Sequence, residues 1–240
     1  MKGGNMGEFC WKKSAAIVLA AGSGKRMNQT IKKQFIPLNG NPLLYYSLKV
    51  FSDVGMGRII LVTAEEDFAY CEEQFIRSRK FSCPITLVGG GNERYDSVYA
   101  GLQQATGAEY VFIHDGARPC LEKSVLSRIA ECVETYQACV AAVPVKDTIK
   151  IVDQQGFAVE TPNRNQLWAV QTPQVFSYQI VMDAYDKMIH DRKDNILITD
   201  DAMVVENYSH HLVKMVEGSY RNIKVTTRED LALAEAYLSE

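Results

Sequence analysis

The sequence lacks the features that define several broad classes of protein. No apolar run approaches the roughly 20 residues that a membrane-spanning helix needs. The first residues carry glycines and cations but not the apolar stretch of a secretory signal. An excess of positive charge is also missing, because the formal net charge is -3 at pH 7. We therefore expect neither nucleic acid nor a membrane as a partner.

Cysteine is present, but not in a pattern that binds metal. The 6 cysteines are scattered along the chain, and no two of them form a C-x-x-C motif. This spacing disfavours a zinc cluster, and a disulfide framework is unusual in a chain of 240 residues. Cys132 and Cys139 have apolar neighbours in the sequence, which favours buried free thiols. We expect a reduced protein of the cytoplasm.

Apolar runs alternate with amphipathic stretches along the first part of the chain. After a first buried strand that begins at residue 15, strands are predicted at residues 58–63, 85–88, 110–114 and 138–143. Helices are predicted at residues 42–51, 66–77, 95–105 and 122–136. Asn41 should cap the first of these helices, with Pro42 at its first helical position. The alternation predicts an α/β fold whose mainly parallel sheet is covered by helices on both faces.

The alternation breaks after Pro144. Residues 145–152 and 157–161 flank a polar turn and predict a β-hairpin. This hairpin is either a surface excursion or an arm that embraces a second subunit, and the pattern alone favours neither. Beyond it we predict helices at residues 178–190, after Thr199 and after Thr227, and strands at residues 212–216 and 223–225. Thr227 and Asp230 form a predicted capping box for the last helix.

The most informative segment runs from Leu19 to Met27. A buried strand passes directly into small residues, two glycines and the cations Lys25 and Arg26. Small residues let backbone N–H groups approach an anion closely. The segment is not a P-loop, which needs glycine in place of Leu19 and a hydroxyl residue in place of Arg26, and Met27 replaces the last glycine of a dinucleotide fingerprint. Together with a second cation pair that ends at Lys33, it predicts a cradle for a polyphosphate.

Three segments with polar or small residues follow predicted strands. They are the glycine loop, residues 89–91 and residues 114–116. Because ligands bind beyond the carboxyl ends of parallel strands, we expect all three segments to meet at one edge of the sheet. Asp115 at the end of a strand suits magnesium or a ribose hydroxyl, or alternatively the capping of the next helix. His114 has apolar neighbours and is predicted to be a packed, hydrogen-bonded side chain rather than a catalyst.

Taken together, the motifs point to one family. They are, in order, L-A-A-G-S-G-K-R-M, K-Q-F, G-N-E-R-Y-D-S-V, H-D-G-A-R-P, D-T-I-K, R-N-Q-L-W, Q-T-P-Q, I-T-D-D and N-I-K-V-T. This series resembles the 2-C-methyl-D-erythritol 4-phosphate cytidylyltransferases of the non-mevalonate isoprenoid pathway, over about residues 15–238. The resemblance implies a Rossmann-like nucleotidyltransferase fold. It also implies that CTP and 2-C-methyl-D-erythritol 4-phosphate, a polyol phosphate, are converted to 4-diphosphocytidyl-2-C-methyl-D-erythritol and pyrophosphate with Mg²⁺ as cofactor.

The resemblance also implies roles for individual residues. Arg26 and Lys33 match the catalytic cations that stabilise negative charge on the α-phosphoryl group. The nucleotide-binding positions are Ala20, Ala21, Gly22, Gly24, Gly91, Asn92, Ser97, Asp115, Gly116 and Arg118, and Asp115 is also the expected metal ligand. The positions that hold the sugar phosphate are Thr148, Arg164, Thr172 and Lys224. Asn92 departs from the family, which commonly has an acidic residue there; an amide still accepts hydrogen bonds but carries no charge.

In the family, the hairpin reaches the neighbouring subunit. The resemblance therefore divides the chain into an N-terminal extension, residues 1–14, and one nucleotidyltransferase domain, residues 15–240, in which residues 145–171 form an arm for homodimerisation. Thr148 and Arg164 would then complete the partner's site. Two other functions stay open: a ribitol-5-phosphate cytidylyltransferase of the same fold, and a domain that binds CTP without reacting. The motifs at residues 91–98 and 114–119 favour the methylerythritol enzyme over the ribitol enzyme.

Overall fold

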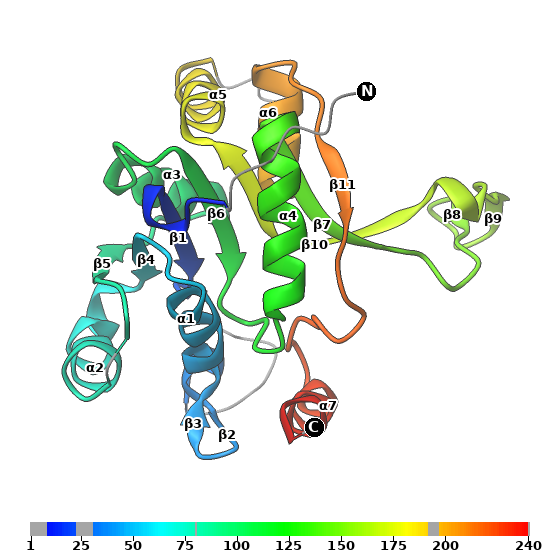
Figure 1. The fold of residues 1–240 in the computed structure, drawn as a ribbon. Helices are drawn as coiled ribbons and strands as arrows, with labels where there is room; N and C mark the ends of the chain where they lie inside the picture. Colours follow the sequence, from blue (N-terminus) through cyan, green and yellow to red (C-terminus); the bar gives the residue numbers. More distant parts are fainter. Residues whose placement is uncertain (1–8, 23–30, 80, 192–196, 240) are drawn as a thin grey trace, which may run out of the picture.

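The computed structural model describes residues 9–22, 31–79, 81–191 and 197–239. Their centre is a 7-stranded sheet in the order β11-β7-β10-β6-β1-β4-β5 (Figure 1). The strands are β1 (Ser14–Leu19), β4 (Arg58–Thr63), β5 (Ile85–Gly89), β6 (Tyr110–Asp115), β7 (Ala138–Pro144), β10 (Trp168–Ser177) and β11 (Lys214–Glu217). Only β10 runs antiparallel to its neighbours, β6 and β7. The prediction of a mainly parallel sheet is confirmed.

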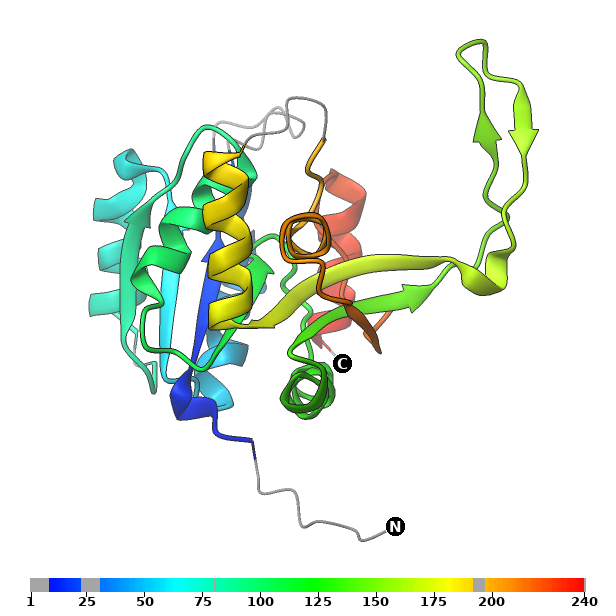
Figure 2. The ribbon, with the colours of Figure 1, turned by 90° about the horizontal axis from the view of Figure 1, so that it is seen from above.

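Helices cover both faces of this sheet (Figures 1 and 2). They are α1 (Leu43–Asp53), α2 (Phe68–Cys71), α3 (Arg94–Gln104), α4 (Lys123–Tyr136), α5 (Tyr178–His190), α6 (Asp201–Tyr208) and α7 (Arg228–Ser239). Alternate residues of β1 supply both hydrophobic cores, because successive side chains of a strand point to opposite faces. Ala16 and Val18 pack with α1 and α4, whereas Ala15 and Ile17 pack with α3, α5 and α6. This two-sided burial explains the continuous apolar runs of the central strands.

The segment after β7 leaves the domain as an arm, as Figure 2 shows. Strands β8 (Ile151–Val152) and β9 (Ala158–Glu160) pair antiparallel near its end. The turn between them is held by Asp153, whose carboxylate accepts hydrogen bonds from the backbone N–H groups of Gln155 and Phe157, both at 2.9 Å. The predicted hairpin is confirmed. Its apolar side chains are exposed, with Phe157 at 68% and Val159 at 63%.

Local departures from the predicted elements have identifiable causes. Helix α1 begins at Leu43, because Asn41–Pro42 form strand β3, which pairs with β2 (Pro37–Leu38). Asn41 does not cap the helix; its side-chain oxygen accepts from Nη1 of Arg79 at 2.7 Å. The predicted strand at residues 223–225 is also absent. Among the described residues no strand pairs with this segment, and the N–H of Val225 donates instead to the carbonyl of Ala117 at 2.9 Å.

Two more segments refine the predictions. The helix predicted at residues 66–77 divides into η4 (Glu65–Asp67), α2 and the π-helical η5 (Glu72–Arg77). The capping box of α7 is confirmed, because Thr227 N–H donates to Asp230 Oδ2 at 2.8 Å and Asp230 N–H donates to Thr227 Oγ1 at 3.4 Å. At the other end of the chain, part of the N-terminal extension packs against the domain. The Phe9 ring is buried, 5.6 Å from the ring of Tyr110 on β6.

In the described ranges of the chain, no helix is both long enough and apolar enough to cross a membrane.

Candidate active site

A pocket lies beyond the carboxyl ends of β1, β5 and β6. It has a volume of about 550 Å³, within the size range of small-molecule sites. Its lining residues are Leu19, Ala20, Ala21, Gly22, Lys33, Gln34, Gly91, Asn92, Glu93, Arg94, Ser97, Asp115, Ala117 and Lys224. The pocket therefore gathers residues from all three of the strand-end segments, as the sequence predicts. Two of the predicted site residues, Gly24 and Arg26, lie outside the described residues.

The first two segments contact each other closely. Ala20 N–H donates to Val62 O at 2.7 Å, and Gly90 N–H donates to Thr63 O at 2.9 Å, so both segments are hydrogen-bonded to the end of β4, the strand that lies between β1 and β5. A side chain at Gly90 would place its Cβ 2.4 Å from the Cβ of Ala21. Only glycine allows this approach. The close packing aligns the backbone of the glycine loop, at residues 20–22, with the segment at residues 89–92.

The segment at residues 89–92 passes into α3 through a capping box. The Glu93 side chain accepts from the backbone of the third helical residue, and Asp96 Oδ2 accepts from Glu93 N–H at 3.1 Å. Ser97 Oγ accepts from Gly91 N–H at 3.1 Å, which fixes the turn before the helix. These bonds leave Asn92 exposed at the rim of the pocket. Ser97 is buried, lines the pocket and supports the turn through its bond to Gly91 N–H.

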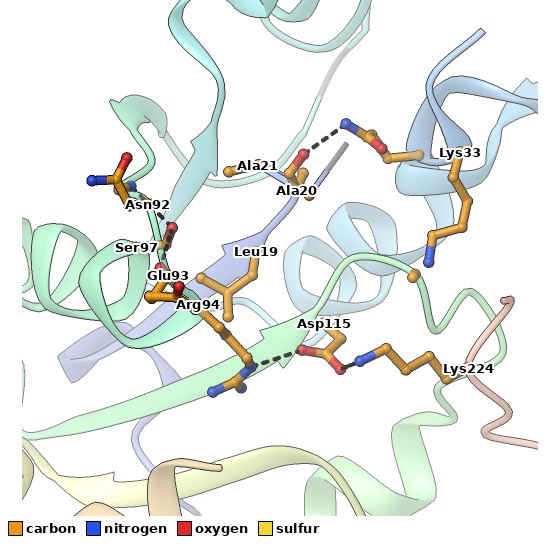
Figure 3. Close-up of a pocket in the computed structure, with 14 residues that line it drawn as sticks. Leu19, Ala20, Ala21, Lys33, Asn92, Glu93, Arg94, Ser97, Asp115 and Lys224 are labelled. Carbon is orange, nitrogen blue, oxygen red and sulfur yellow. Dashed lines mark hydrogen bonds and ion pairs between the residues drawn. The ribbon is translucent and has the colours of Figure 1, made fainter. Parts of the chain in front are cut away.

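Asp115 lies at the centre of the site's charges (Figure 3). Its Oδ2 is 2.7 Å from Nζ of Lys224, and its Oδ1 is 3.5 Å from Nε of Arg94. Arg118 is a third cation, with Nε 4.0 Å from Oδ2. Burial alone would raise the pKa of the Asp115 carboxyl, but these three cations hold that pKa well below its usual range. Asp115 is therefore an anion that organises positive charge around the pocket.

Arg94 is a member of this cluster that the sequence analysis did not single out. Its Nη1 and Nη2 each donate to the carboxylate of Asp201 at 2.8 Å, and that carboxylate also accepts from the hydroxyl of Tyr185 at 2.6 Å. The two acids raise the pKa of the Arg94 guanidinium despite its burial. The arginine of the G-N-E-R motif was the one sequence signal that could have identified Arg94. Its partner Asp201 is 107 residues away in the chain, so the sequence does not show the pairing. Asp200 caps α6, with Oδ1 accepting from Met203 N–H at 3.0 Å.

Lys33 reaches the pocket from η3 (Lys33–Phe35), on the side opposite Asn92 (Figure 3). Its amine is directed toward the side where Asp115 and Lys224 meet. The next residue, Gln34, is almost fully buried at 3% exposure and donates from Nε2 to Ala20 O at 2.7 Å. The site thus combines two lysines, one arginine and two carboxylates around a loop of small residues. Such a pocket suits a polyanionic ligand.

Thr172 and His114 form a buried pair beneath Asp115. Thr172 Oγ1 accepts from Asp115 N–H at 3.0 Å and lies 3.0 Å from His114 Nδ1. His114 Nε2 lies 3.3 Å from Arg118 O, and burial lowers the pKa of this imidazole to about 4. The prediction of a packed, hydrogen-bonded histidine is confirmed. The hydroxyl of Thr172 is engaged within the fold, outside the described lining of the pocket.

Gly116 and Arg118 also stand behind the described lining rather than in it. A Cβ at Gly116 would meet Leu44 Cδ1 at 2.7 Å and Leu19 O at 3.0 Å, so the close packing of β6 on β1 requires glycine there. Arg118 Nη1 donates to Asn222 O at 2.8 Å. This bond holds the segment that carries Lys224 against the end of β6.

Two of the predicted sugar-phosphate residues lie on the arm. Thr148 and Arg164 are exposed there, and Arg164 Nη1 donates to Lys146 O at 2.8 Å. Arg164 begins η6 (Arg164–Gln166), whose first turn is capped by Asn163. Because the arm extends away from the sheet (Figure 2), the structure does not bring these two residues into the pocket of their own chain.

Few protein ligands for a metal are present. In the described ranges no three His, Cys, Asp or Glu side chains lie together as a group that could hold a metal ion. Of the two acids that line the pocket, Glu93 caps α3, and both Asp115 oxygens face cations. This donor set does not fit a metal held by the protein alone. It fits Mg²⁺ that arrives on a triphosphate, since Mg²⁺ commonly takes one or two carboxylates together with substrate phosphates.

Comparison with known proteins gives a consistent answer. The sequence model of the family described as 2-C-methyl-D-erythritol 4-phosphate cytidylyltransferase matches residues 14–240. A protein of that name from Lachnospira eligens is 47% identical over 226 residues, which cover 94% of this chain and 99% of the relative. One from Clostridium novyi is 44% identical, covering 94% and 96%. The crystal structure of 4-diphosphocytidyl-2C-methyl-D-erythritol synthase from Anaerococcus prevotii is similar with a TM-score of 0.82 and 31% identity, over 96% of this chain and 100% of that one.

Proposed function

The chain belongs to the family of 2-C-methyl-D-erythritol 4-phosphate cytidylyltransferases, and on this premise we propose that it transfers the cytidylyl group of CTP to 2-C-methyl-D-erythritol 4-phosphate. The products are 4-diphosphocytidyl-2-C-methyl-D-erythritol and pyrophosphate. The observation that carries the proposal is the meeting of Lys33, Asp115 and Lys224 with the nucleotide loop in one pocket. The identity of the two substrates is taken from the family, whose model matches residues 14–240.

The reaction needs positive charge more than it needs a base. A phosphate oxygen of the polyol phosphate attacks the α-phosphorus of CTP, a new P–O bond forms, and the bond to the β-phosphate breaks so that pyrophosphate leaves. The attacking monoester is already an anion near neutral pH. Negative charge therefore has to be stabilised on the α-phosphoryl oxygens, which suits the amine of Lys33 and, by the family pattern, Arg26.

Lys224 holds the second substrate in this proposal, and Asp115 positions the Lys224 amine. The ion pair between them, at 2.7 Å, keeps the Lys224 amine at the pocket wall, where 43% of its side chain is exposed. An arriving phosphate can take over part of that pairing. Because the Lys224 amine is already held at the pocket wall, less side-chain entropy is lost when the phosphate binds.

Mg²⁺ enters the proposal as the magnesium complex of CTP. The triphosphate supplies most of its oxygens, and Asp115 is the pocket carboxylate available to it. Removal of Mg²⁺ with a chelator should stop pyrophosphate release, and added Mg²⁺ should restore it. Binding of the metal in the absence of a nucleotide should not be measurable by calorimetry. A tight site in the nucleotide-free protein would contradict this assignment.

We further propose that the arm joins two subunits, with Thr148 and Arg164 reaching the partner's pocket. Exposed apolar side chains along the arm support this, since Phe157 is 68% exposed. A mixing experiment tests it. Lys33→Ala and Arg164→Ala each damage one part of a shared site, so a mixed dimer contains one intact site. Equal amounts, unfolded and refolded together, should recover about one quarter of wild-type activity. If separately refolded and co-refolded samples are equally inactive, the shared site is wrong.

The direct test of the reaction is pyrophosphate release from CTP. We expect release with 2-C-methyl-D-erythritol 4-phosphate and much less with ribitol 5-phosphate. Faster turnover of ribitol 5-phosphate would favour the sister enzyme instead. CTP binding without release for either substrate would favour a regulatory domain. The location in the cytoplasm stays a prediction, which cell fractionation can test.

A further inference from the structure

The short helix η3 holds Lys33 between two anchored neighbours. On one side, Lys32 Nζ lies 2.8 Å from Glu66 Oε1 and 2.7 Å from Asp67 Oδ2. On the other side, Gln34 Nε2 donates to Ala20 O at 2.7 Å. Consecutive side chains thus have different partners: the first joins η4, the second faces the pocket and the third joins the nucleotide loop.

These two anchors differ in their exposure to solvent. The Lys32 side chain is 30% exposed and Glu66 is 72% exposed, so water and salt screen the Lys32–Glu66 pair more than the Lys32–Asp67 pair, in which Asp67 is 11% exposed. Gln34, by contrast, is 3% exposed, and its bond to Ala20 lies in the buried interior. A buried hydrogen bond defines a position more sharply than an exposed ion pair between long side chains.

The bond from Gln34 ties together two parts of the site. Ala20 continues β1, its N–H donates to Val62 O at 2.7 Å, and it lines the pocket. Lys33 lines the same pocket but reaches it through a flexible four-carbon stem. The place of its amine depends on where its own backbone is held. Gln34 sets that backbone relative to the loop that surrounds the nucleotide.

We infer that Gln34 is a positioning residue, which holds η3 so that Lys33 faces the α-phosphoryl group of the nucleotide bound against Ala20. This inference rests on the proposed function, in which Lys33 stabilises the reacting phosphate. Gln34 touches no reacting atom in this assignment and acts only through Lys33. Misplacement of a reacting group by about 1 Å can cost about 100-fold in rate, so a lost anchor is measurable.

The alternative is that Gln34 serves the nucleotide loop and affects CTP binding instead. A double-mutant cycle separates the two roles. Gln34→Met keeps the volume of the side chain and removes the donor, and it is made in wild type and in Lys33→Ala. Gln103→Met, an exposed glutamine near the end of α3, is the matched control. Pyrophosphate release gives kcat and KM for both substrates, and thermal melting reports folding.

We expect Gln34→Met to lower kcat by about 10- to 100-fold with little change in the KM for CTP. In the Lys33→Ala background the same change should cost less than about 2-fold, because the group it positions is gone. Gln103→Met should match wild type. If Gln34→Met does not fold, Gln34→Leu, which is smaller and also lacks the donor, takes its place in the cycle.

Two results would overturn the inference. Equal losses from Gln34→Met in both backgrounds would mean that it acts independently of Lys33. A raised KM for CTP with unchanged kcat would assign it to the loop. Either result leaves the proposed function intact, provided that the wild-type protein releases pyrophosphate. Absence of release from the wild-type protein, or full activity of Lys33→Ala, would instead refute the reaction or the role of Lys33, and the inference with it.

Discussion

The carboxylate of Asp201 joins three elements around the site, and its replacement by alanine gives a quantitative test of how they are held. The side chain is fully buried at the start of α6. It accepts two hydrogen bonds from the guanidinium of Arg94, both at 2.8 Å, and one from the hydroxyl of Tyr185 at 2.6 Å. Asp201→Ala removes all three bonds and leaves both donors without this partner.

The expected loss in the free energy of unfolding depends on whether each donor finds another hydrogen-bond partner in the variant. The Tyr185 side chain is fully buried, and an unsatisfied buried hydroxyl costs about 2 kcal/mol. The Arg94 side chain is 31% exposed, so water and nearby Asp115 compensate for much of its loss, and about 1 kcal/mol remains. The total is about 3 kcal/mol, which in a chain of this size lowers Tm by about 6–12 °C.

Urea unfolding followed by circular dichroism measures this loss, with calorimetry for Tm. Asp183→Ala is the control, because Asp183 is an exposed residue of α5 that accepts from Gln179 Nε2 at 2.7 Å. It should change the free energy of unfolding by less than about 0.5 kcal/mol. Tyr185→Phe should cost less than Asp201→Ala, since it removes one bond without stranding a donor. A loss below about 1 kcal/mol for Asp201→Ala would refute the reasoning.

Three further predictions concern the pocket. Because burial lowers the pKa of His114 to about 4, the free energy of unfolding should fall by about 3 kcal/mol as the pH drops from about 6.5 to about 4, and a His114→Gln variant should lose this slope. Lys224→Ala removes the cation that lies 2.7 Å from Asp115. Steady-state kinetics should show a rise of about 10-fold or more in the KM for the polyol phosphate and a smaller change in the KM for CTP. Gly90→Ala places a Cβ 2.4 Å from that of Ala21, so calorimetry should show CTP binding weakened about 10-fold or more; wild-type affinity would mean that the two segments need not touch.

Much of the fold follows from local patterns. The strand at Arg58–Thr63 and the helix at Tyr178–His190 have the predicted bounds, because periodicity and flanking residues agree in those segments. Errors occur where a tertiary partner outweighs local preference. Asn41 is a good N-cap by type, yet it pairs in a short ribbon and accepts from Arg79. Residues 223–225 have strand-forming side chains, but a strand exists only if another strand is beside it.

The candidate site shows the same division. The order of motifs and the rule for parallel sheets place Ala20, Gly91 and Asp115 at one edge, and the pocket contains all three. Arg94 and Gln34 were missed as functional residues. Each lies inside a quoted motif, but its role depends on a partner chosen by the fold: Asp201 for Arg94, and Ala20 for Gln34. Sequence spacing carries no information about such pairs.

The sequence by itself determined the class of fold, the family and the edge of the sheet where the pocket lies. It could do so because side-chain period, glycine positions and the direction of parallel strands are properties of the chain read locally. Only the tertiary structure decided how the charges are arranged: Asp115 faces three cations, and Thr172 supports it from behind instead of lining the described pocket. Those contacts join residues that are far apart in the chain. They are fixed by packing and burial, which no local pattern records.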